Sequence, residues 1–160
     1  QLVMGDALAV CLLKLRGFSS DDFARFHPGG ALGKTLYLRV QDITSQNMKP
    51  QVSKETPLKD VIVEISRNML GVTAVLDQEE VVGIITDGDL RRMLSSAEDF
   101  TQLKAKDIMS EHPKTIKNSA MAIEALELLE NNDITQLIAL ESGKYAGIVH
   151  LHNLVKEGII

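Results

Sequence analysis

The sequence predicts an α+β fold in which one β-α-β-β-α unit occurs twice. Short apolar runs bounded by turn residues alternate with segments of helical periodicity, a pattern that indicates strands and helices within small mixed units. The same order of segments returns in the second half of the chain. Gly83 and Gly147, each inside an apolar run, are 64 positions apart, and Thr73 and Thr135 are 62 apart. Landmarks that recur at nearly one offset indicate an internal repeat.

Composition and charge exclude several classes of protein. The 160 residues are 44% hydrophobic and 24% charged, as in ordinary globular domains. The 17 basic and 22 acidic residues give a net charge of −5, which argues against a nucleic-acid partner. No apolar run is long enough to span a membrane, and no secretory leader is recognisable. A single cysteine, Cys11, cannot form an internal disulfide. We therefore expect a cytoplasmic protein without a membrane partner.

The N-terminal segment, residues 4–15, has the pattern of a strongly apolar helix. Met4, Leu8, Leu12 and Leu15 recur at helical intervals. A helix with this much apolar surface needs something to pack against. Because the chain enters the helix without an initiator methionine, we expect it to be a fragment whose preceding domain supplies that surface.

The next segment combines a short helix with a glycine-rich turn. Ser20 is predicted to cap the helix, with Asp21 and Asp22 in its first turn. The sequence His-Pro-Gly-Gly follows from His27 and forces a tight turn that exposes backbone amides. Two interpretations remain open. The turn is either a rigid elbow between domains, or it holds His27 as a catalytic acid or base at a sugar-phosphate site.

The first repeat is predicted to follow a connector at 36–40. Asp42-Ile43 opens a segment that Asp107-Ile108 repeats. The expected elements are a short strand at 52–53, a helix capped by Thr56 that runs to Met69, strands at 72–76 and 81–86, and a helix that follows Asp87 and ends near Ser96. A polar linker at 97–104 follows.

The second repeat is predicted to contain the same elements in the same order. They are a short strand at 115–116, a helix capped by Ser119, strands at 136–140 and 145–150, and a turn at 141–144 between the strands. On the helix, Glu124, Glu127 and Glu130 are expected to face solvent.

The junction of strand and helix at Gly83–Leu90 is the strongest candidate for a binding site. Asp87 is predicted to cap the helix, and the free amides of its first turn suit an anion. A carboxylate such as that of Asp89 can accept hydrogen bonds from both hydroxyls of a ribose. Arg91 and Arg92 follow one turn later and suit a phosphate. The alternative for the aspartates is simple helix capping, and for the arginines a solvated surface.

The motif Gly-Ile-Ile-Thr-Asp-Gly-Asp-Leu at 83–90, together with the repeat, resembles the CBS domain (cystathionine-β-synthase type) over residues 38–160. The resemblance implies two domains, 38–96 and 105–160, that pack as a pseudo-twofold pair around clefts for nucleotides. It also implies that Thr86 and Asp89 contact ribose and phosphate. We add Asp87, Arg91, Arg92 and Thr73 to the predicted site.

The N-terminal quarter resembles a narrower family. The chain resembles arabinose-5-phosphate isomerases in four segments. These are residues 5–9, 23–24 and 27–33 and the sequence Thr-Asp-Gly-Asp-Leu-Arg-Arg at 86–92. In these enzymes a sugar isomerase (SIS) domain precedes a CBS pair, and they interconvert ribulose 5-phosphate and arabinose 5-phosphate on the route to Kdo and lipopolysaccharide.

By this resemblance residues 1–37 are the end of a SIS domain, and His27 matches an active-site histidine. The other catalytic groups of that domain would precede Gln1, so we expect this chain alone to be inactive. The expected partners are the chain's own SIS domain and further copies of the protein in a homo-oligomer.

The second repeat departs from the motif. His150 stands in place of Thr86, and Asn153 in place of Asp89, so the two clefts are expected to be unequal. His150 and His152 lack a third ligand nearby, and we predict no metal site. No cofactor is expected to be required. The predicted ligand is a regulatory nucleotide, with CMP-Kdo first and AMP or ATP second. The alternative is a purely structural module that dimerises without a ligand.

Overall fold

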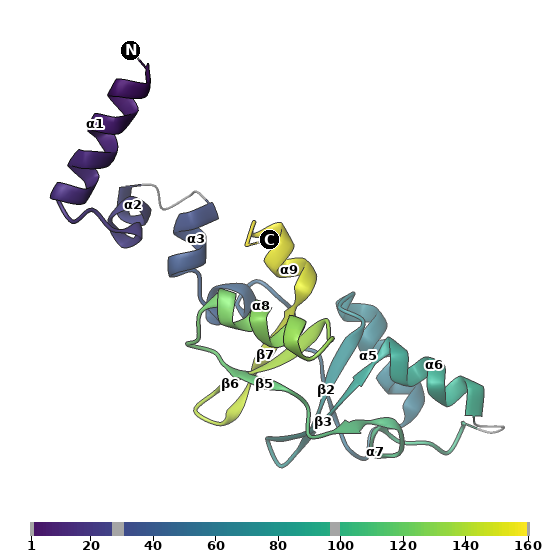
Figure 1. Cartoon of the computed structure of the whole chain (residues 1–160). Coiled ribbons are helices and arrows are strands. Elements are labelled where there is room, and N and C mark those ends of the chain that lie inside the picture. Colours follow the sequence, from purple (N-terminus) through teal and green to yellow (C-terminus); the bar gives the residue numbers. More distant parts are fainter. Residues whose placement is uncertain (1, 27–30, 97–99, 160) are drawn as a thin grey trace.

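A computed structural model describes residues 2–26, 31–96 and 100–159 and confirms the α+β fold (Figure 1). Three helices come first: α1 (Leu2–Leu15), α2 (Ser20–Phe26) and α3 (Ala31–Tyr37). The first repeat contains α4 (Val40–Thr44), β1 (Gln51–Ser53), α5 (Leu58–Asn68), β2 (Val72–Asp77), β3 (Glu80–Thr86) and α6 (Asp87–Ser96). The second contains α7 (Ala105–Ile108), β4 (Ser110–Glu111), β5 (Thr115–Lys117), α8 (Ala122–Asn131), β6 (Gln136–Glu141), β7 (Lys144–His150) and α9 (Leu151–Lys156).

The two sheets share a three-strand arrangement, to which β4 adds a fourth strand beside β3 in the first sheet. Their strand orders are β1-β2-β3-β4 and β5-β6-β7. In each, a short strand lies parallel to the first strand of an antiparallel hairpin, with Val52 opposite Val75 and Ile116 opposite Ala139. Each hairpin also has an irregularity at the same place, after Val75 and after Ala139. The predicted repeat is therefore present in the register of the strands.

The structure corrects one landmark of the repeat. The amide of Asp87 donates to the Gly71 carbonyl at 3.0 Å, and the amide of Leu151 donates to the Thr135 carbonyl at 2.9 Å. Gly71 and Thr135 therefore hold the same place, immediately before β2 and β6. The match of Thr135 to Thr73 was wrong. Pairing the two threonines by residue type placed the second repeat two residues out of register with the first.

One apolar face of each long helix covers its sheet. On α5 the buried side chains are Leu58, Val61 and Ile65. On α8 they are Ala122, Ala125, Leu126 and Leu129, at the spacing of one helical face. Glu124, Glu127 and Glu130 of α8 are exposed, which confirms their predicted orientation.

The segments that open the two repeats pack on each other's sheets. Val40 and Ile43 of α4 are 0% and 2% exposed and belong to the core that contains Leu137 and Val149 of the second sheet. Conversely, Ala105 of α7 is buried in the core of the first sheet. The sequence pattern showed that these segments recur but did not show that they cross over. As a result, neither sheet has a complete core without a segment from the other repeat.

This crossing moves the helix starts away from their predicted caps. The amide of Leu58 donates to the Leu103 carbonyl at 2.9 Å, and the amide of Ala122 donates to the Leu38 carbonyl at 2.8 Å. Pro57 and Met121 are consequently the N-caps, and the predicted caps Thr56 and Ser119 were wrong.

The structure also corrects two predictions near the N-terminus. Helix α2 begins at Ser20, and the Ser19 hydroxyl accepts from the Asp22 amide at 3.2 Å, so Ser19 caps the helix in place of Ser20. Residues 36–40, predicted to be a connector, end α3 and begin α4.

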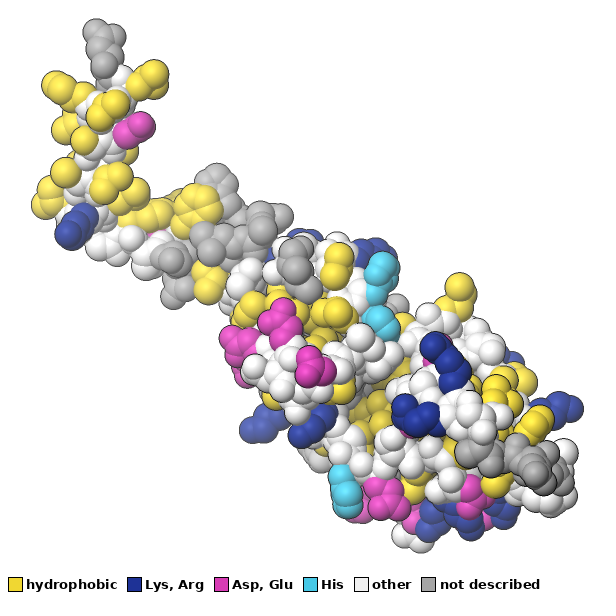
Figure 2. Space-filling model, turned by 45° about the vertical axis from the view of Figure 1, so that its right-hand side comes forward, with side chains coloured by type: hydrophobic (Ala, Val, Ile, Leu, Met, Phe, Trp, Pro, Cys, Tyr) yellow, Lys and Arg dark blue, Asp and Glu magenta, His cyan; other side chains and the backbone are white. Residues whose placement is uncertain are grey.

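The N-terminal helix α1 stands away from both sheets (Figure 1). Apolar side chains surround it and are open to solvent, as Figure 2 shows at the end of the molecule farthest from the sheets. Leu2, Leu8 and Leu15 are 86%, 61% and 84% exposed. Within residues 2–26, 31–96 and 100–159, no helix combines the length and apolar character that crossing a bilayer requires.

Candidate functional site

Thr86 and Asp89 cap helix α6 together. The backbone amide and the hydroxyl of Thr86 both donate to Asp89 Oδ2, each at 2.7 Å, and Thr86 Oγ1 accepts from the Asp89 amide at 3.4 Å. This is the reciprocal capping box of a helix N-terminus. Asp87 is the first helical residue, so its prediction as the N-cap was wrong. Thr86 is the better cap because its side chain reaches the amide three residues on.

The other oxygen of Asp89 is also engaged. Oδ1 accepts from Arg92 Nη2 at 2.6 Å and from Ser110 Oγ at 3.0 Å, and the residue is 6% exposed. Burial tends to raise the pKa of this carboxyl. The hydrogen bonds from Thr86, Arg92 and Ser110 outweigh burial and hold its pKa below the ordinary value. Asp89 is therefore a carboxylate at neutral pH, with four donors directed at it.

A cavity of about 440 Å³ opens directly over this group. Thr86, Asp89 and Arg92 form one wall. The opposite side comes from the second repeat, where the residues after β4 and those before β6 meet. Ile84, Pro113 and Ile134 offer apolar contacts. The charged lining residues besides Asp89 are the cations Arg92 and Lys114 and the acids Glu111 and Asp133. The size is within the usual range for small-molecule sites.

Several of these lining residues were not predicted from the sequence. No sequence motif marks the positions of Ser110, Lys114, Asp133 and Gln136. These residues reach the cavity because the second repeat packs on the first. His112 and Asp133 have left-handed backbones, with φ of 53° and 51°. That conformation is uncommon outside glycine and often accompanies functional sites. A repeat alignment corrected at Gly71 would have pointed to the residues just before β6.

The equivalent turn of the second repeat is built from different groups. His150 is the N-cap of α9, and its Nδ1 accepts from the His152 amide at 3.0 Å. Asn153 Oδ1 accepts from the His150 amide at 3.2 Å and from Asn47 Nδ2 at 3.0 Å. Burial, and secondarily His152, lower the pKa of His150. The turn therefore holds a neutral imidazole and an amide where the first repeat holds a hydroxyl and a carboxylate.

His150 and Asn153 are not among the residues that line the Asp89 cavity. Asn153 lines a separate pocket of about 80 Å³ with Asn47, Lys156 and Glu157. The cavity beside Asp89 is ligand-sized, whereas the pocket beside Asn153 is several times smaller. Asn47 and Asn153, which line the small pocket, are hydrogen-bonded to each other.

The remaining predicted residues lie elsewhere. Thr73 is fully buried inside β2, and Arg91 is exposed on α6 outside the cavity. Asp87 lies against Gly71, where a Cβ atom would be 2.8 Å from Asp87 Oδ2. His27 lies outside the described residues. Among the residues that are described, no group of three or more His, Cys, Asp or Glu side chains is arranged to hold a metal ion.

Comparison with known proteins places this geometry in a family. The CBS domain model matches residues 40–96 and 105–159, which include both turns. The chain belongs to the CBS domain family. It is 42% identical, over 99% of its length, to the C-terminal part of the arabinose 5-phosphate isomerase KdsD of Salmonella typhi. It is 41% identical to the protein of the same name from Pseudomonas aeruginosa. The chain covers 49% and 50% of these proteins and so spans about half the length of the curated relatives it matches.

Solved CBS structures share the fold. The CBS domain protein PAE2072 from Pyrobaculum aerophilum, in complex with AMP, has a TM-score of 0.66 and 16% identity and covers 73% of this chain and 90% of its own. The CBS domain of the bacterial CNNM/CorC family Mg²⁺ transporter, in complex with ATP, has a TM-score of 0.64 and 18% identity and covers 80% and 91%. At these identities the likeness establishes the fold.

Proposed function

We propose that this CBS pair is a regulatory nucleotide-binding module of a sugar-phosphate aldose-ketose isomerase. The observation that carries the proposal is the cavity of about 440 Å³ over Asp89, a buried carboxylate with four hydrogen-bond donors. Two neighbours of the same fold were solved with AMP and ATP, which supports a nucleotide as the ligand class.

The chemistry of the cavity suits each part of a nucleotide. Asp89 would accept from the two ribose hydroxyls, which would replace the Ser110 hydroxyl and the Arg92 guanidinium at Oδ1. Arg92, once displaced, and Lys114 would pair with phosphate oxygens. Ile84, Pro113 and Ile134 would contact the faces of the base. The second turn, with His150 and Asn153, would bind no nucleotide or bind it more weakly.

The regulated activity is assigned to the rest of a longer protein. The relatives are arabinose 5-phosphate isomerases, and this chain covers half of each. We propose that the whole protein interconverts arabinose 5-phosphate and ribulose 5-phosphate on the route to Kdo and lipopolysaccharide, as a homo-oligomer. The exposed apolar side chains of α1 would pack in the SIS domain, and His27 would serve its active site. The chain by itself would show no isomerase turnover.

CMP-Kdo is the first candidate ligand, because a late product of the same route would give feedback on an early step. It combines a ribose and a phosphate with a sugar carboxylate, which Arg92 or Lys114 would pair with. AMP and ATP are second. Thermal unfolding of the chain with CMP-Kdo, CMP, AMP and ATP in turn tests the assignment. A ligand that binds only the folded state raises the unfolding temperature. No rise with any of the four would overturn nucleotide sensing.

A structural role is the second candidate, and two observations favour it. Asp89 is fully hydrogen-bonded without a ligand. Apolar side chains are also exposed on the first repeat, where Val63, Met69 and Leu94 are 52%, 90% and 59% exposed. Self-association measured by analytical ultracentrifugation for the wild type and for Asp89→Ala separates the roles. If the variant loses nucleotide binding and still associates, the two functions are distinct.

A further inference from the structure

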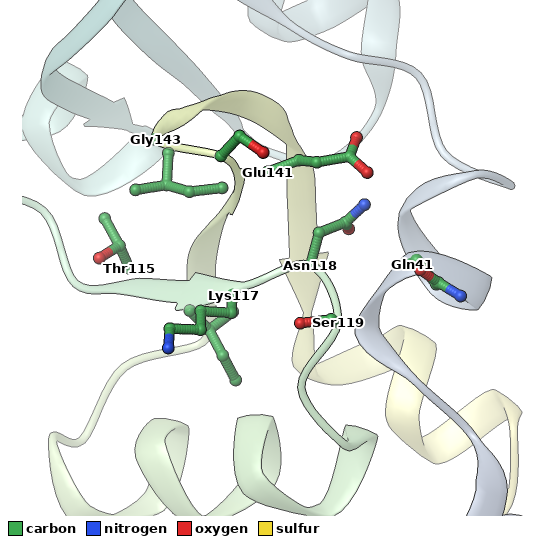
Figure 3. A pocket seen from close by; sticks show the side chains of 10 residues that line it. Gln41, Thr115, Lys117, Asn118, Ser119, Glu141 and Gly143 are labelled. Atoms are coloured by element: carbon green, nitrogen blue, oxygen red, sulfur yellow. The ribbon is translucent and has the colours of Figure 1, made fainter.

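A second and larger pocket lies at the far end of the second sheet. It measures about 690 Å³ and is formed by β5 and the residues that follow it, by the β6–β7 turn, and by α4 (Figure 3). We call it the β5 pocket. It shares no lining residue with the Asp89 cavity. β5 is also an edge strand of its sheet, so the pocket opens beside unpaired backbone.

The first repeat has the same corner, and there ion pairs connect its charged side chains. Lys54 and Asn118 hold equivalent places, because their amides donate to the Leu76 and Leu140 carbonyls at 3.2 and 2.7 Å. In the first repeat Lys54 pairs with Asp77. Its neighbour Glu55 pairs with Lys104 and Lys106, each at 2.7 Å. Those bonds, led by the one from Lys104, lower the pKa of Glu55 to about 2.

The second repeat has neutral residues at most of these positions. Asn118 replaces Lys54, Ser119 replaces Glu55 and Gln41 replaces Lys106. Glu141 keeps the acid of Asp77, and Arg39 keeps the cation of Lys104 but donates to the Ser119 carbonyl at 2.6 Å. Among the described residues, no Lys, Arg or His lies within ion-pair distance of Glu141. The loss of the cations at the Lys54 and Lys106 positions leaves the Glu141 carboxylate, the amides of Asn118 and Gln41 and the Ser119 hydroxyl around the pocket.

Asn118 is held in place in the β5 pocket, and several polar groups there can still bond a ligand. Asn118 Oδ1 accepts from Thr44 Oγ1 at 2.9 Å, which fixes the amide plane and leaves its nitrogen with two donors for a ligand. In Figure 3 the Asn118 amide and the Glu141 carboxylate point to the same end of the pocket, and Ser119 and Lys117 lie below them. Within the described part of the chain, the side chains of Ser119 and Lys117 bond no other protein group.

We propose that the β5 pocket binds a sugar or polyol. Amides, hydroxyls and one carboxylate together donate to and accept from the adjacent hydroxyls of such a molecule. The one cation, Lys117, and the one anion, Glu141, leave the lining without net charge, which does not favour a polyanion. The lining also has no aromatic ring to stack on a base. The site is separate from the nucleotide proposal and does not rest on it.

Titrating the ¹⁵N-labelled chain with ribitol and D-ribose, and following its amide resonances by NMR, tests the proposal. We expect saturable shifts at residues 117–119 and 141–143, unchanged in Asp89→Ala. Asn118→Lys places an ammonium opposite Glu141, as Lys54 lies opposite Asp77, and should weaken binding at least about tenfold. Glu141→Gln should also weaken it. The matched control Lys54→Asn, in the first repeat, should leave binding unchanged.

Three outcomes would overturn the proposal. The first is the absence of saturable shifts with either compound. The second is shifts that neither Asn118→Lys nor Glu141→Gln weakens. In the third, ribose 5-phosphate and inorganic phosphate shift these amides while ribitol and D-ribose do not, which would show an anion bound at Lys117 alone.

Discussion

Asp89 Oδ2 accepts two hydrogen bonds from one residue, the amide and the hydroxyl of Thr86, both at 2.7 Å. This contact lies where β3 ends and α6 begins, and its two residues line one wall of the candidate nucleotide site. In the equivalent pair, the His150 amide donates to Asn153 Oδ1 at 3.2 Å, and this contact caps α9 without a charged group. Mutations in the two turns can therefore separate the capping of the helix from the binding of a ligand.

Asp89→Ala should lower the free energy of unfolding by about 1–3 kcal/mol, because it leaves the Thr86 amide and the Ser110 hydroxyl without their acceptor. Urea unfolding measures this. Asn153→Ala, the matched change in the second repeat, removes only neutral hydrogen bonds and should cost less. Equal losses for the two variants would contradict the central place given to Asp89.

His150 should make the stability depend on pH near neutrality. Its pKa is lowered in the folded state, from an ordinary value of 6.5, so the unfolded chain takes up the proton first as pH falls. Stability is therefore full above pH 6.5 and declines below it, until the folded-state pKa is reached. Protonation at Nδ1 would also break the bond from the His152 amide.

The variant His150→Asn keeps an N-cap acceptor and has no titrating ring. Urea unfolding at about pH 7.5 and about pH 5.5 compares the two proteins. The wild type should lose more stability between these values than the variant. The same loss in both would show that His150 is not the group responsible.

Gly83 and Gly147 occupy equivalent positions but should differ in their tolerance of alanine. A Cβ at Gly83 would lie 2.6, 2.9 and 3.1 Å from Sδ, Cγ and Cβ of Met109, an unbranched side chain that would have to shift. A Cβ at Gly147 would lie 3.0 Å from Thr44 Cβ, and the backbone there has φ of +154°. Gly83→Ala should cost about 1–2 kcal/mol and Gly147→Ala about 2–3 kcal/mol by urea unfolding, because Gly147 adds backbone strain to the close contact. The reverse order would contradict this packing.

Ile43→Ala should destabilise the second sheet although Ile43 lies in the first repeat. The residue is 2% exposed in the core with Leu137 and Val149, so truncation should cost about 2–5 kcal/mol. Amide hydrogen exchange should accelerate in β6 and β7. Ile62→Ala, at a position 39% exposed on α5, is the control and should change stability little. Faster exchange confined to β1–β3 would contradict the crossing of α4.

The sequence predicted what depends on local pattern. The apolar runs gave both hairpins within one or two residues of their ends, because period and turn residues are local signals. Thr86 and Asp89 followed from the motif, and the structure places them on one wall of a cavity. The unequal turns followed from His150 and Asn153.

What the sequence did not reveal depends on contacts between distant segments. The caps at Thr56 and Ser119 were wrong because Leu103 and Leu38, far along the chain, satisfy the first amides of those helices. Ser110 and Asp133 were missed because only the packing of one repeat on the other brings them to Asp89. The β5 pocket stands out as a candidate site only when the ion pairs of the two repeats are compared, and that comparison requires the correct register.

The stoichiometry and location of nucleotide binding test the central claim most directly. Isothermal titration calorimetry should find one site per chain for at least one of CMP-Kdo, CMP, AMP and ATP. Asp89→Asn should weaken that binding at least about tenfold, since it removes the charge that accepts from the ribose hydroxyls. Asn153→Ala should leave it unchanged. Binding that survives Asp89→Asn and is lost in Asn153→Ala would contradict the account.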